Sequence, residues 1–125
     1  KGYEALLPYL RSDPQLRENF YQKMQCLWFA GAALAQHVFE EVQELAVQTV
    51  GERIPFLTGF GATESAPFAL ARIWETDNST NMGLPGVGVE LKLVPMDGKF
   101  DARLKGPNLT PGYWREPELT NDAWH

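Results

Sequence analysis

Residues 26–58 read CLWFAGAALAQHVFEEVQELAVQTVGERIPFLT. This stretch opens and closes with short apolar runs, residues 26–30 and 54–58, of the kind that fully buried strands show. Between them, residues 35–50 carry apolar side chains at steps of three and four, which is typical of an amphipathic helix. Gly51 ends this helix, because glycine readily takes the left-handed conformation that closes one. Strand, helix and strand in this order predict a right-handed parallel crossover.

The polar side chains of the central helix are expected to face solvent: Glu40, Glu41, Gln43, Glu44 and Gln48. The carboxylates among them have no histidine or aspartate partners, so we interpret them as a solvated surface rather than a metal site. His37, alone near the start of the helix, is also expected to face solvent. Cys26 lies among apolar residues, which predicts an inert buried thiol.

Two shorter helical patterns come before this unit, in residues 3–10 and 16–24. Asp13 and Pro14 separate them. Aspartate is a favoured helix N-cap, and proline suits the first helical position because no amide hydrogen is needed there. We therefore expect a second helix that starts at Pro14.

The second half of the chain predicts a β-hairpin. Apolar and polar residues alternate in residues 89–93 and 100–104, so each strand has one apolar face. The pair Asp97-Gly98 between them is a strong hairpin signal, because both residues tolerate positive φ.

The composition changes after Ala71, where a polar loop and several glycines interrupt the pattern. We expect an α/β portion at residues 1–74, a connecting loop at 75–82 and an antiparallel β portion at 83–125. The chain starts at Lys1 without a methionine and shows no terminal helix, so both ends are expected to be cut from a longer chain.

The composition is that of an ordinary globular protein, with 125 residues, 44% hydrophobic residues and a net charge of -5. No basic stripe is available to hold a phosphate backbone, so nucleic acid is not an expected partner. No long apolar run or signal-peptide pattern is present, so a membrane is not expected either. One cysteine cannot form an internal disulfide, which suits the cytoplasm.

Residues 58–65, TGFGATES, follow the second predicted strand. In an open parallel sheet, ligands collect beyond the carboxyl ends of the strands. The string offers glycines for close backbone approach, a ring for stacking, a hydroxyl and a carboxylate suited to magnesium: Gly59, Gly61, Phe60, Thr63 and Glu64. From these residues alone, a tight turn with Thr63 or Ser65 capping a helix explains the string equally well.

Four stretches in order decide between these interpretations, because together they resemble the adenylate-forming superfamily of acyl-CoA synthetases, nonribosomal peptide adenylation domains and luciferases. They are Ala30–Leu34, Phe60–Ser65, Gly83–Lys92 and the Gly-Pro, Gly-Tyr-Trp and Pro-Glu-x-Thr pattern in residues 105–120. Within the superfamily, the amino-acid sequence is similar to that of feruloyl-CoA synthases, particularly at residues 64–69.

The resemblance implies an internal fragment of a large α/β domain, with a parallel βαβ portion followed by an antiparallel β-barrel-like portion. It implies an ATP-dependent ligase that needs Mg²⁺, joins ferulate or a related hydroxycinnamate to AMP and then transfers the acyl group to CoA. A ligase of the same superfamily that acts on a fatty or benzoic acid remains an alternative.

The resemblance also implies roles for particular residues. Small residues line the adenine pocket and part of the acyl tunnel: Gly31, Ala32 and Ala33. Phe60, between Gly59 and Gly61, stacks on adenine. Thr63 hydrogen-bonds the phosphate that becomes AMP, and Glu64 holds magnesium. The acid is bordered by Ala33, Gly61, Pro67 and Phe68.

Three positions depart from the pattern of the superfamily: Phe60 replaces its usual Tyr, Val87 its second Pro, and Lys105 its common Arg. The phosphate loop, the ribose-binding Asp and the catalytic Lys of the superfamily have no match here, so the piece alone is expected to be inactive. An alternative of another class is a stand-alone nucleotide-binding or interaction module. Self-association through freed strand edges is also expected if the chain is a fragment.

Overall fold

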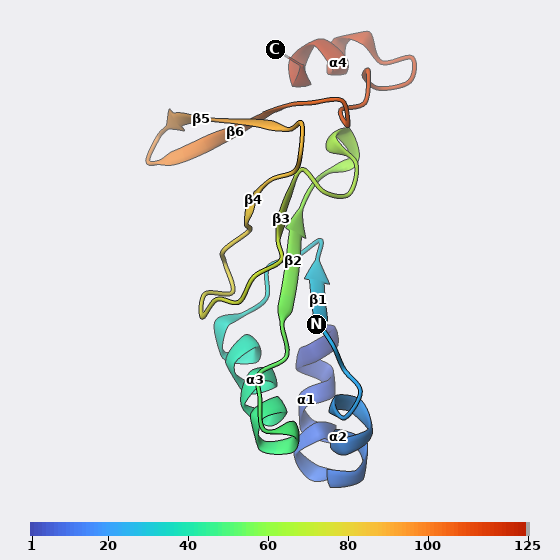
Figure 1. The fold of residues 1–125 in the computed structure, drawn as a ribbon. Coiled ribbons are helices and arrows are strands. Elements are labelled where there is room, and N and C mark those ends of the chain that lie inside the picture. The colour runs from blue at the N-terminus through green and yellow to red at the C-terminus, as the bar shows by residue number, and fades with distance from the viewer. Residues whose placement is uncertain (125) are drawn as a thin grey trace. The chain divides into compact units, whose positions relative to one another are not determined.

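The computed structural model describes residues 1–124, and Figure 1 shows how their helices and strands follow one another. The helices are α1 (Gly2–Ser12), α2 (Pro14–Tyr21), α3 (Gln36–Val50) and α4 (Pro117–Ala123), with a 3-10 turn, η1, at Thr63–Ser65. The strands are β1 (Leu27–Ala30), β2 (Phe56–Phe60), β3 (Leu70–Arg72), β4 (Leu84–Pro85), β5 (Glu90–Met96) and β6 (Lys99–Lys105). No helix among these residues is both long and apolar enough to cross a membrane.

The sheet confirms the predicted α/β class. Strands β1 to β4 form one sheet in that order, and β5 and β6 form a separate two-stranded sheet. β1 and β2 run parallel, with α3 between them along the chain (Figure 1). β2 continues two residues past Thr58, so Gly59 and Phe60 lie in the strand and not in the predicted loop. The strand extends because the Phe60 carbonyl accepts a hydrogen bond of 2.8 Å from the Ala69 amide.

The chain divides into two compact units that interleave along the sequence. The first comprises Lys1–Thr58 and Arg72–Met82, and the second comprises Gly59–Ala71 and Gly83–His125. The division predicted from the sequence is into consecutive portions, at residues 1–74, 75–82 and 83–125, and it stays a prediction. The segment after Thr58 joins the second unit because β3 pairs antiparallel with β4, with Leu70 opposite Pro85 and Ala71 opposite Leu84.

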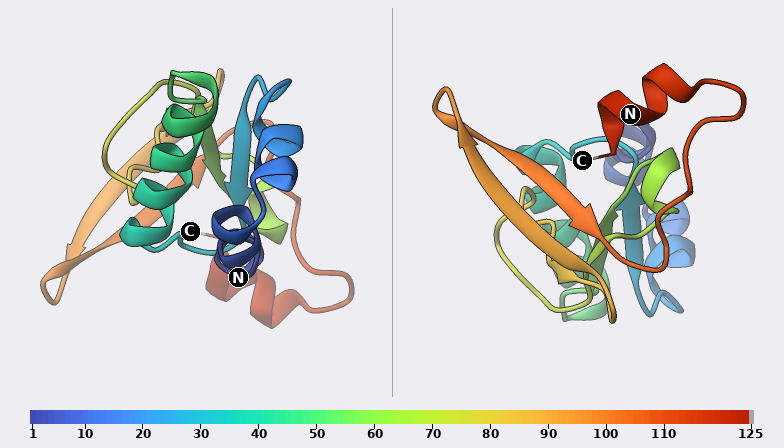
Figure 2. Two further views of the ribbon diagram at one scale, coloured as in Figure 1. Left: turned by 90° about the horizontal axis from the view of Figure 1, so that it is seen from below. Right: turned by 90° about the horizontal axis from the view of Figure 1, so that it is seen from above.

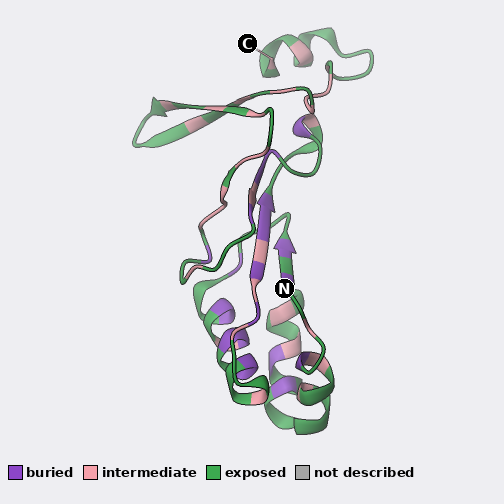
Figure 3. Ribbon diagram, in the orientation of Figure 1, coloured by how far each residue is buried: buried purple, intermediate pink, exposed green. Residues whose placement is uncertain are grey.

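The first unit has an aromatic core centred on Phe56 of β2. The ring centroids of Tyr3, Phe29 and Phe39 lie 5.1, 5.3 and 5.2 Å from that of Phe56. Helices α1, α2 and α3 pack against one another and add further buried side chains (Figures 2 and 3): Leu7, Leu10, Tyr21, Val38, Val42, Leu45 and Ala46. This apolar burial is the main force that fixes β2, the strand that leads to the predicted site.

The predicted helix ends of the first unit are confirmed. The Asp13 carboxylate accepts a hydrogen bond of 3.0 Å from the Leu16 amide, and Pro14 is the first residue of α2. Gly51 follows α3 with a φ of 83°, the left-handed conformation expected of a C-terminal glycine.

Two predictions about exposure, those for Gln43 and Cys26, are wrong. Gln43, expected to face solvent, is buried, because its amide donates to the Ile54 carbonyl at 2.7 Å and accepts from the Ile54 amide at 3.1 Å. Cys26, expected to be buried, is exposed, because it lies just before β1 begins at Leu27. His37 is exposed as predicted.

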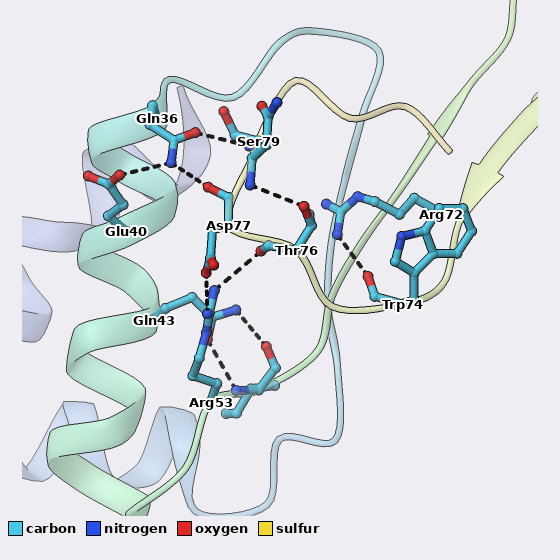
Figure 4. A network of polar contacts seen from close by, with 11 residues as sticks. Gln36, Glu40, Gln43, Arg53, Arg72, Trp74, Thr76, Asp77 and Ser79 are labelled. Carbon is cyan, nitrogen blue, oxygen red and sulfur yellow. Dashed lines mark hydrogen bonds and ion pairs between the residues drawn. The ribbon is translucent and has the colours of Figure 1, made fainter. Parts of the chain in front are cut away.

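The polar loop at residues 75–82 is held by hydrogen bonds to α3 and to the segment before β2 (Figure 4). The Gln36 amide donates to the Asp77 carbonyl at 2.7 Å and accepts from the Ser79 amide at 3.0 Å. The Arg53 guanidinium forms an ion pair of 2.6 Å with the Asp77 carboxylate. These contacts explain why this segment belongs to the first unit although it follows β3.

The predicted hairpin of the second unit is confirmed. Residues Asp97 and Gly98 turn between β5 and β6 with φ values of 46° and 77°, as a tight hairpin requires. The strands pair from Glu90 opposite Lys105 to Met96 opposite Lys99. Much of the apolar face is exposed, with Leu93 at 52% and Phe100 at 65%. A two-stranded hairpin is marginally stable alone, so the barrel-like arrangement stays a prediction.

The prediction that no terminal helix is present is wrong, because residues 117–123 form α4. Pro117 takes the first helical position, and Glu118 lies in the first turn, where a carboxylate suits the helix dipole. Both signals for a helix are therefore present in the sequence.

Candidate functional site

Residues 60–69 form a closed loop at the carboxyl end of β2. The hydrogen bond from the Ala69 amide to the Phe60 carbonyl joins its two ends. Within the loop, the Ala62 amide donates to the Ser65 hydroxyl at 3.0 Å, and Ser65 is 2% exposed. This contact is the capping role that the sequence left open for Ser65, and it closes η1.

Two glycines let the loop fold back on itself. A β-carbon at Gly61 would lie 2.3 Å from the Pro67 carbonyl oxygen, and one at Gly59 would lie 2.5 Å from the Phe68 ring. Real β-carbons do not approach other atoms so closely, so both positions need glycine. Gly59 and Gly61 thus pack against Phe68 and Pro67, a role in the protein itself beside the expected one toward a ligand.

Glu64 is held at two points by the segment before α4. Its backbone carbonyl accepts a hydrogen bond of 2.8 Å from the Thr110 amide. Its carboxylate oxygen Oε1 accepts a hydrogen bond from the Tyr113 hydroxyl. This bond lowers the pKa of the Glu64 carboxyl and raises the pKa of the Tyr113 phenol, so Glu64 carries its charge at neutral pH.

A third contact joins the same two segments. The Asn108 side-chain amide donates to the Ser65 carbonyl at 2.6 Å. Asn108 in turn lies against Gly106, where a β-carbon would come within 2.6 Å of the Asn108 oxygen. Residues 106–113 therefore hold the η1 turn through three acceptor groups: the Glu64 carboxylate, the Glu64 carbonyl and the Ser65 carbonyl.

Tyr113 is itself fixed by α4. Its amide donates to the Thr120 hydroxyl at 2.9 Å, and its ring packs edge-on against Trp124 with centroids 5.2 Å apart. The Trp124 indole donates to the Thr110 carbonyl at 3.0 Å. The helix that the sequence analysis missed thus supports the residues that hold Glu64.

A cavity of about 390 Å³ lies beside the loop in the second unit. Phe60 and Trp124 line it with rings, Glu64 adds a carboxylate, and Arg103 and Lys105 add cationic groups. Arg103 pairs with Asp101 at 2.8 Å and Lys105 with Glu90 at 3.1 Å, both on the same hairpin. Rings together with a few charged groups are the kind of lining that small-molecule sites have.

The remaining predicted residues fall into two groups. Thr63, Pro67 and Phe68 are exposed and lie on the same loop as Glu64. Gly31, Ala32 and Ala33 belong to the first unit, where they follow β1 and are exposed. Ala32 and Ala33 line a cavity of about 490 Å³ there, together with Tyr3 and Trp28.

The residues that hold Glu64 could not be predicted from the sequence. Thr110 and Asn108 carry no recognisable signal, because their contacts depend on a fold that brings residues 64 and 110 together. In the sequence, Tyr113 stands out only as part of the Gly-Tyr-Trp pattern, which gives it no role of its own. Among residues 1–124, no group of three or more His, Cys, Asp or Glu side chains could hold a metal ion by itself.

Comparison with known proteins identifies the family. No protein-family model matches the chain. A feruloyl-CoA synthase from Amycolatopsis is 30% identical over an alignment of 136 positions, which covers 98% of this chain and 26% of that protein. A long-chain-fatty-acid–CoA ligase from Escherichia coli is 32% identical over 93 residues, 68% of this chain and 16% of that protein.

The chain belongs to the adenylate-forming superfamily. The fold agrees, since the crystal structure of apo MatB from Rhodopseudomonas palustris superposes with a TM-score of 0.70 over 98% of this chain and 24% of that chain, at 23% identity. The chain spans about a quarter of the length of the feruloyl-CoA synthase it matches.

Proposed function

We propose that this chain carries the nucleotide-facing loop of an ATP-dependent acid–CoA ligase, which forms an acyl-adenylate and then an acyl-CoA thioester. The observation that carries the proposal is the closed loop at residues 60–69, which presents Phe60, Thr63 and Glu64 at the carboxyl end of a parallel strand. The similarity to CoA ligases along 98% of the chain supports it.

The loop fits a magnesium ion. Magnesium is usually bound by one or two carboxylates together with substrate phosphates and waters, so a dedicated cluster is not required. Glu64 is ionised, and the Tyr113 hydroxyl holds its carboxylate through Oε1. When bound, magnesium neutralises the charge of the phosphates during adenylyl transfer.

The nucleotide is assigned to exposed groups of the same chain. Phe60 is 42% exposed, so its ring is available to stack on adenine. The exposed Thr63 hydroxyl is assigned to the phosphate that becomes AMP. Gly31, Ala32 and Ala33 are assigned to the adenine pocket and the acyl tunnel, where their small side chains leave room for flat groups.

Ferulate or a related hydroxycinnamate is the proposed acid, bordered by Ala33, Gly61, Pro67 and Phe68. Phe68 is 47% exposed and offers an aromatic surface. The similarity to feruloyl-CoA synthase supports this choice, whereas the similarity to fatty-acid–CoA ligases favours a second candidate, a fatty acid. Benzoic acid is the third acid to compare.

Turnover by the full-length protein that contains this chain tests the assignment. ATP, CoA and magnesium are supplied with ferulate, octanoate or benzoate, and AMP and thioester are measured. The proposal predicts thioester from ferulate at the highest kcat/KM. A higher kcat/KM with octanoate or benzoate would make a fatty acid or benzoic acid the preferred substrate in place of ferulate. Failure to form AMP with any of the three acids would contradict the ligase activity.

The alternative, a stand-alone nucleotide-binding module, is tested on the chain itself by calorimetric titration with AMP and magnesium. We expect weak or no binding, because the phosphate loop and the ribose-binding Asp of the superfamily have no match in these residues. A micromolar dissociation constant that disappears in Phe60→Ala would favour the module instead.

A further inference from the structure

We propose that Tyr113 is a positioning residue for the Glu64 carboxylate, so that the magnesium-binding oxygen is presented by a fixed side chain. The inference rests on the proposed function, because it concerns the role of Glu64 there. It assigns a purpose to the hydrogen bond between two residues that are 49 positions apart in the sequence.

The geometry attaches Glu64 both at its backbone and at its carboxylate. The Tyr113 hydroxyl donates to Oε1 of Glu64, and the Thr110 amide donates to the Glu64 backbone carbonyl at 2.8 Å. A glutamate has three side-chain torsions, and on an exposed turn these would otherwise be free. Two points of attachment, one on the backbone and one at the end of the side chain, remove most of that freedom.

Tyr113 is placed firmly enough to act in this way. The Thr120 hydroxyl accepts from its amide at 2.9 Å and donates to the Glu116 carbonyl at 2.8 Å. Gly112 is packed so tightly that a β-carbon there would lie 2.5 Å from Thr120. With Trp124 against its ring, Tyr113 is therefore held on both the backbone and the side-chain side.

The physical consequence concerns metal binding. Groups that hydrogen-bond a metal-binding carboxylate orient it, and their removal typically weakens metal affinity or activity by roughly 10- to 100-fold. Loss of the Tyr113 hydroxyl should therefore weaken the response to magnesium while leaving contacts with the acid unchanged. A tyrosine that only stabilises the fold would not show this selectivity.

The test in the full-length ligase is a double-mutant cycle. Acid-dependent ATP–pyrophosphate exchange is measured for wild type, Tyr113→Phe, Glu64→Gln and the double variant, with Tyr9→Phe as the control, since Tyr9 is 64% exposed on α1. We expect Tyr113→Phe to raise the magnesium concentration for half-activation by roughly 10- to 100-fold, with the acid KM unchanged. In the Glu64→Gln background the same substitution should add nothing. Equal losses in both backgrounds would overturn the proposal.

A second measurement on the 125-residue chain needs no activity. At one fixed pH, the carbon resonance of the Glu64 carboxyl should shift in Tyr113→Phe but not in Tyr9→Phe, and the Tyr113 ring carbon that bears the hydroxyl should shift in Glu64→Gln. Absence of both shifts would overturn the proposed contact. If the shifts appear but the wild-type enzyme forms no adenylate, the proposed function fails and the contact stands.

Discussion

The backbone of Gly61 lies directly against Pro67, so that a β-carbon at position 61 would come within 2.3 Å of the Pro67 carbonyl oxygen. Both residues lie within the loop that the hydrogen bond from the Ala69 amide to the Phe60 carbonyl closes. The shape of the candidate nucleotide loop therefore depends on one missing methyl group.

Gly61→Ala should open this loop. We expect it to lower the free energy of unfolding of the second unit by about 1–3 kcal/mol, as overpacking typically does, and to abolish adenylation in the full-length enzyme. Urea unfolding followed by Trp fluorescence measures the first effect. Gly2→Ala is the control, because nothing lies within 4 Å of a β-carbon there; equal stability of both variants would contradict the packing argument.

Gln43→Met should destabilise the first unit. The buried Gln43 amide satisfies both the amide and the carbonyl of Ile54, and a side chain of similar size without polar groups would leave both unpaired. We expect a loss of about 2–6 kcal/mol in the free energy of unfolding, since each of the two unsatisfied buried groups costs about 1–3 kcal/mol. Gln48→Met on the exposed face of α3 should cost far less. If both variants lose the same free energy of unfolding in thermal or urea denaturation, the hydrogen bonds between Gln43 and Ile54 do not stabilise the first unit.

Gln43 also shows where sequence reasoning succeeds and fails. Period and caps predict α3, the start of α2 and the Asp97-Gly98 hairpin correctly, because those features depend on neighbours in sequence. The polarity of Gln43 predicts exposure to solvent, yet a partner eleven residues away makes its burial favourable. Burial of polar groups depends on such partners, which periodicity does not reveal.

The candidate site divides in the same way. Gly59 to Glu64 could be found from composition at a strand end and from family resemblance. Tyr113 and Thr110 could not be assigned to Glu64, because the hydrogen bonds join residues 46 and 49 positions apart, through a helix that was not predicted.

Alkaline pH should weaken the first unit through Tyr21. Burial raises the pKa of Tyr21 to about 12, against about 10 in an unfolded chain. Between these values the unfolded chain binds fewer protons than the folded one, so stability falls as pH rises, by roughly 1–3 kcal/mol in total. Below pH 10 the stabilisation is fully present.

Denaturant unfolding from pH 9 to 12 measures this loss. Tyr21→Phe removes the hydrogen bond of 2.9 Å that the Tyr21 hydroxyl donates to the Val42 carbonyl. This variant should therefore be less stable than wild type at pH 9, but its free energy of unfolding should fall less as pH rises. Tyr9→Phe, whose residue is exposed, should keep the wild-type slope. If the free energy of unfolding of Tyr21→Phe falls with pH as steeply as that of wild type, a group other than Tyr21 causes the loss.

Cys26 should react with a thiol reagent in the folded chain, because it is exposed before β1. We expect one thiol per chain to be modified without denaturant, at a rate that changes little when urea is added. Reaction only after unfolding would show that Cys26 is buried, as the sequence predicts, and would contradict its exposure in the structure.

The central claim is that Glu64 serves magnesium-dependent adenylation in the enzyme to which this chain belongs. The most direct measurement is ferulate-dependent ATP–pyrophosphate exchange by the full-length protein at several magnesium concentrations, with wild type compared with Glu64→Gln and with Glu75→Gln, a carboxylate of the exposed loop, as the control. The account predicts exchange in wild type and in Glu75→Gln, and a loss of at least about 100-fold in Glu64→Gln that added magnesium only partly restores. Exchange at the wild-type rate in Glu64→Gln would contradict it.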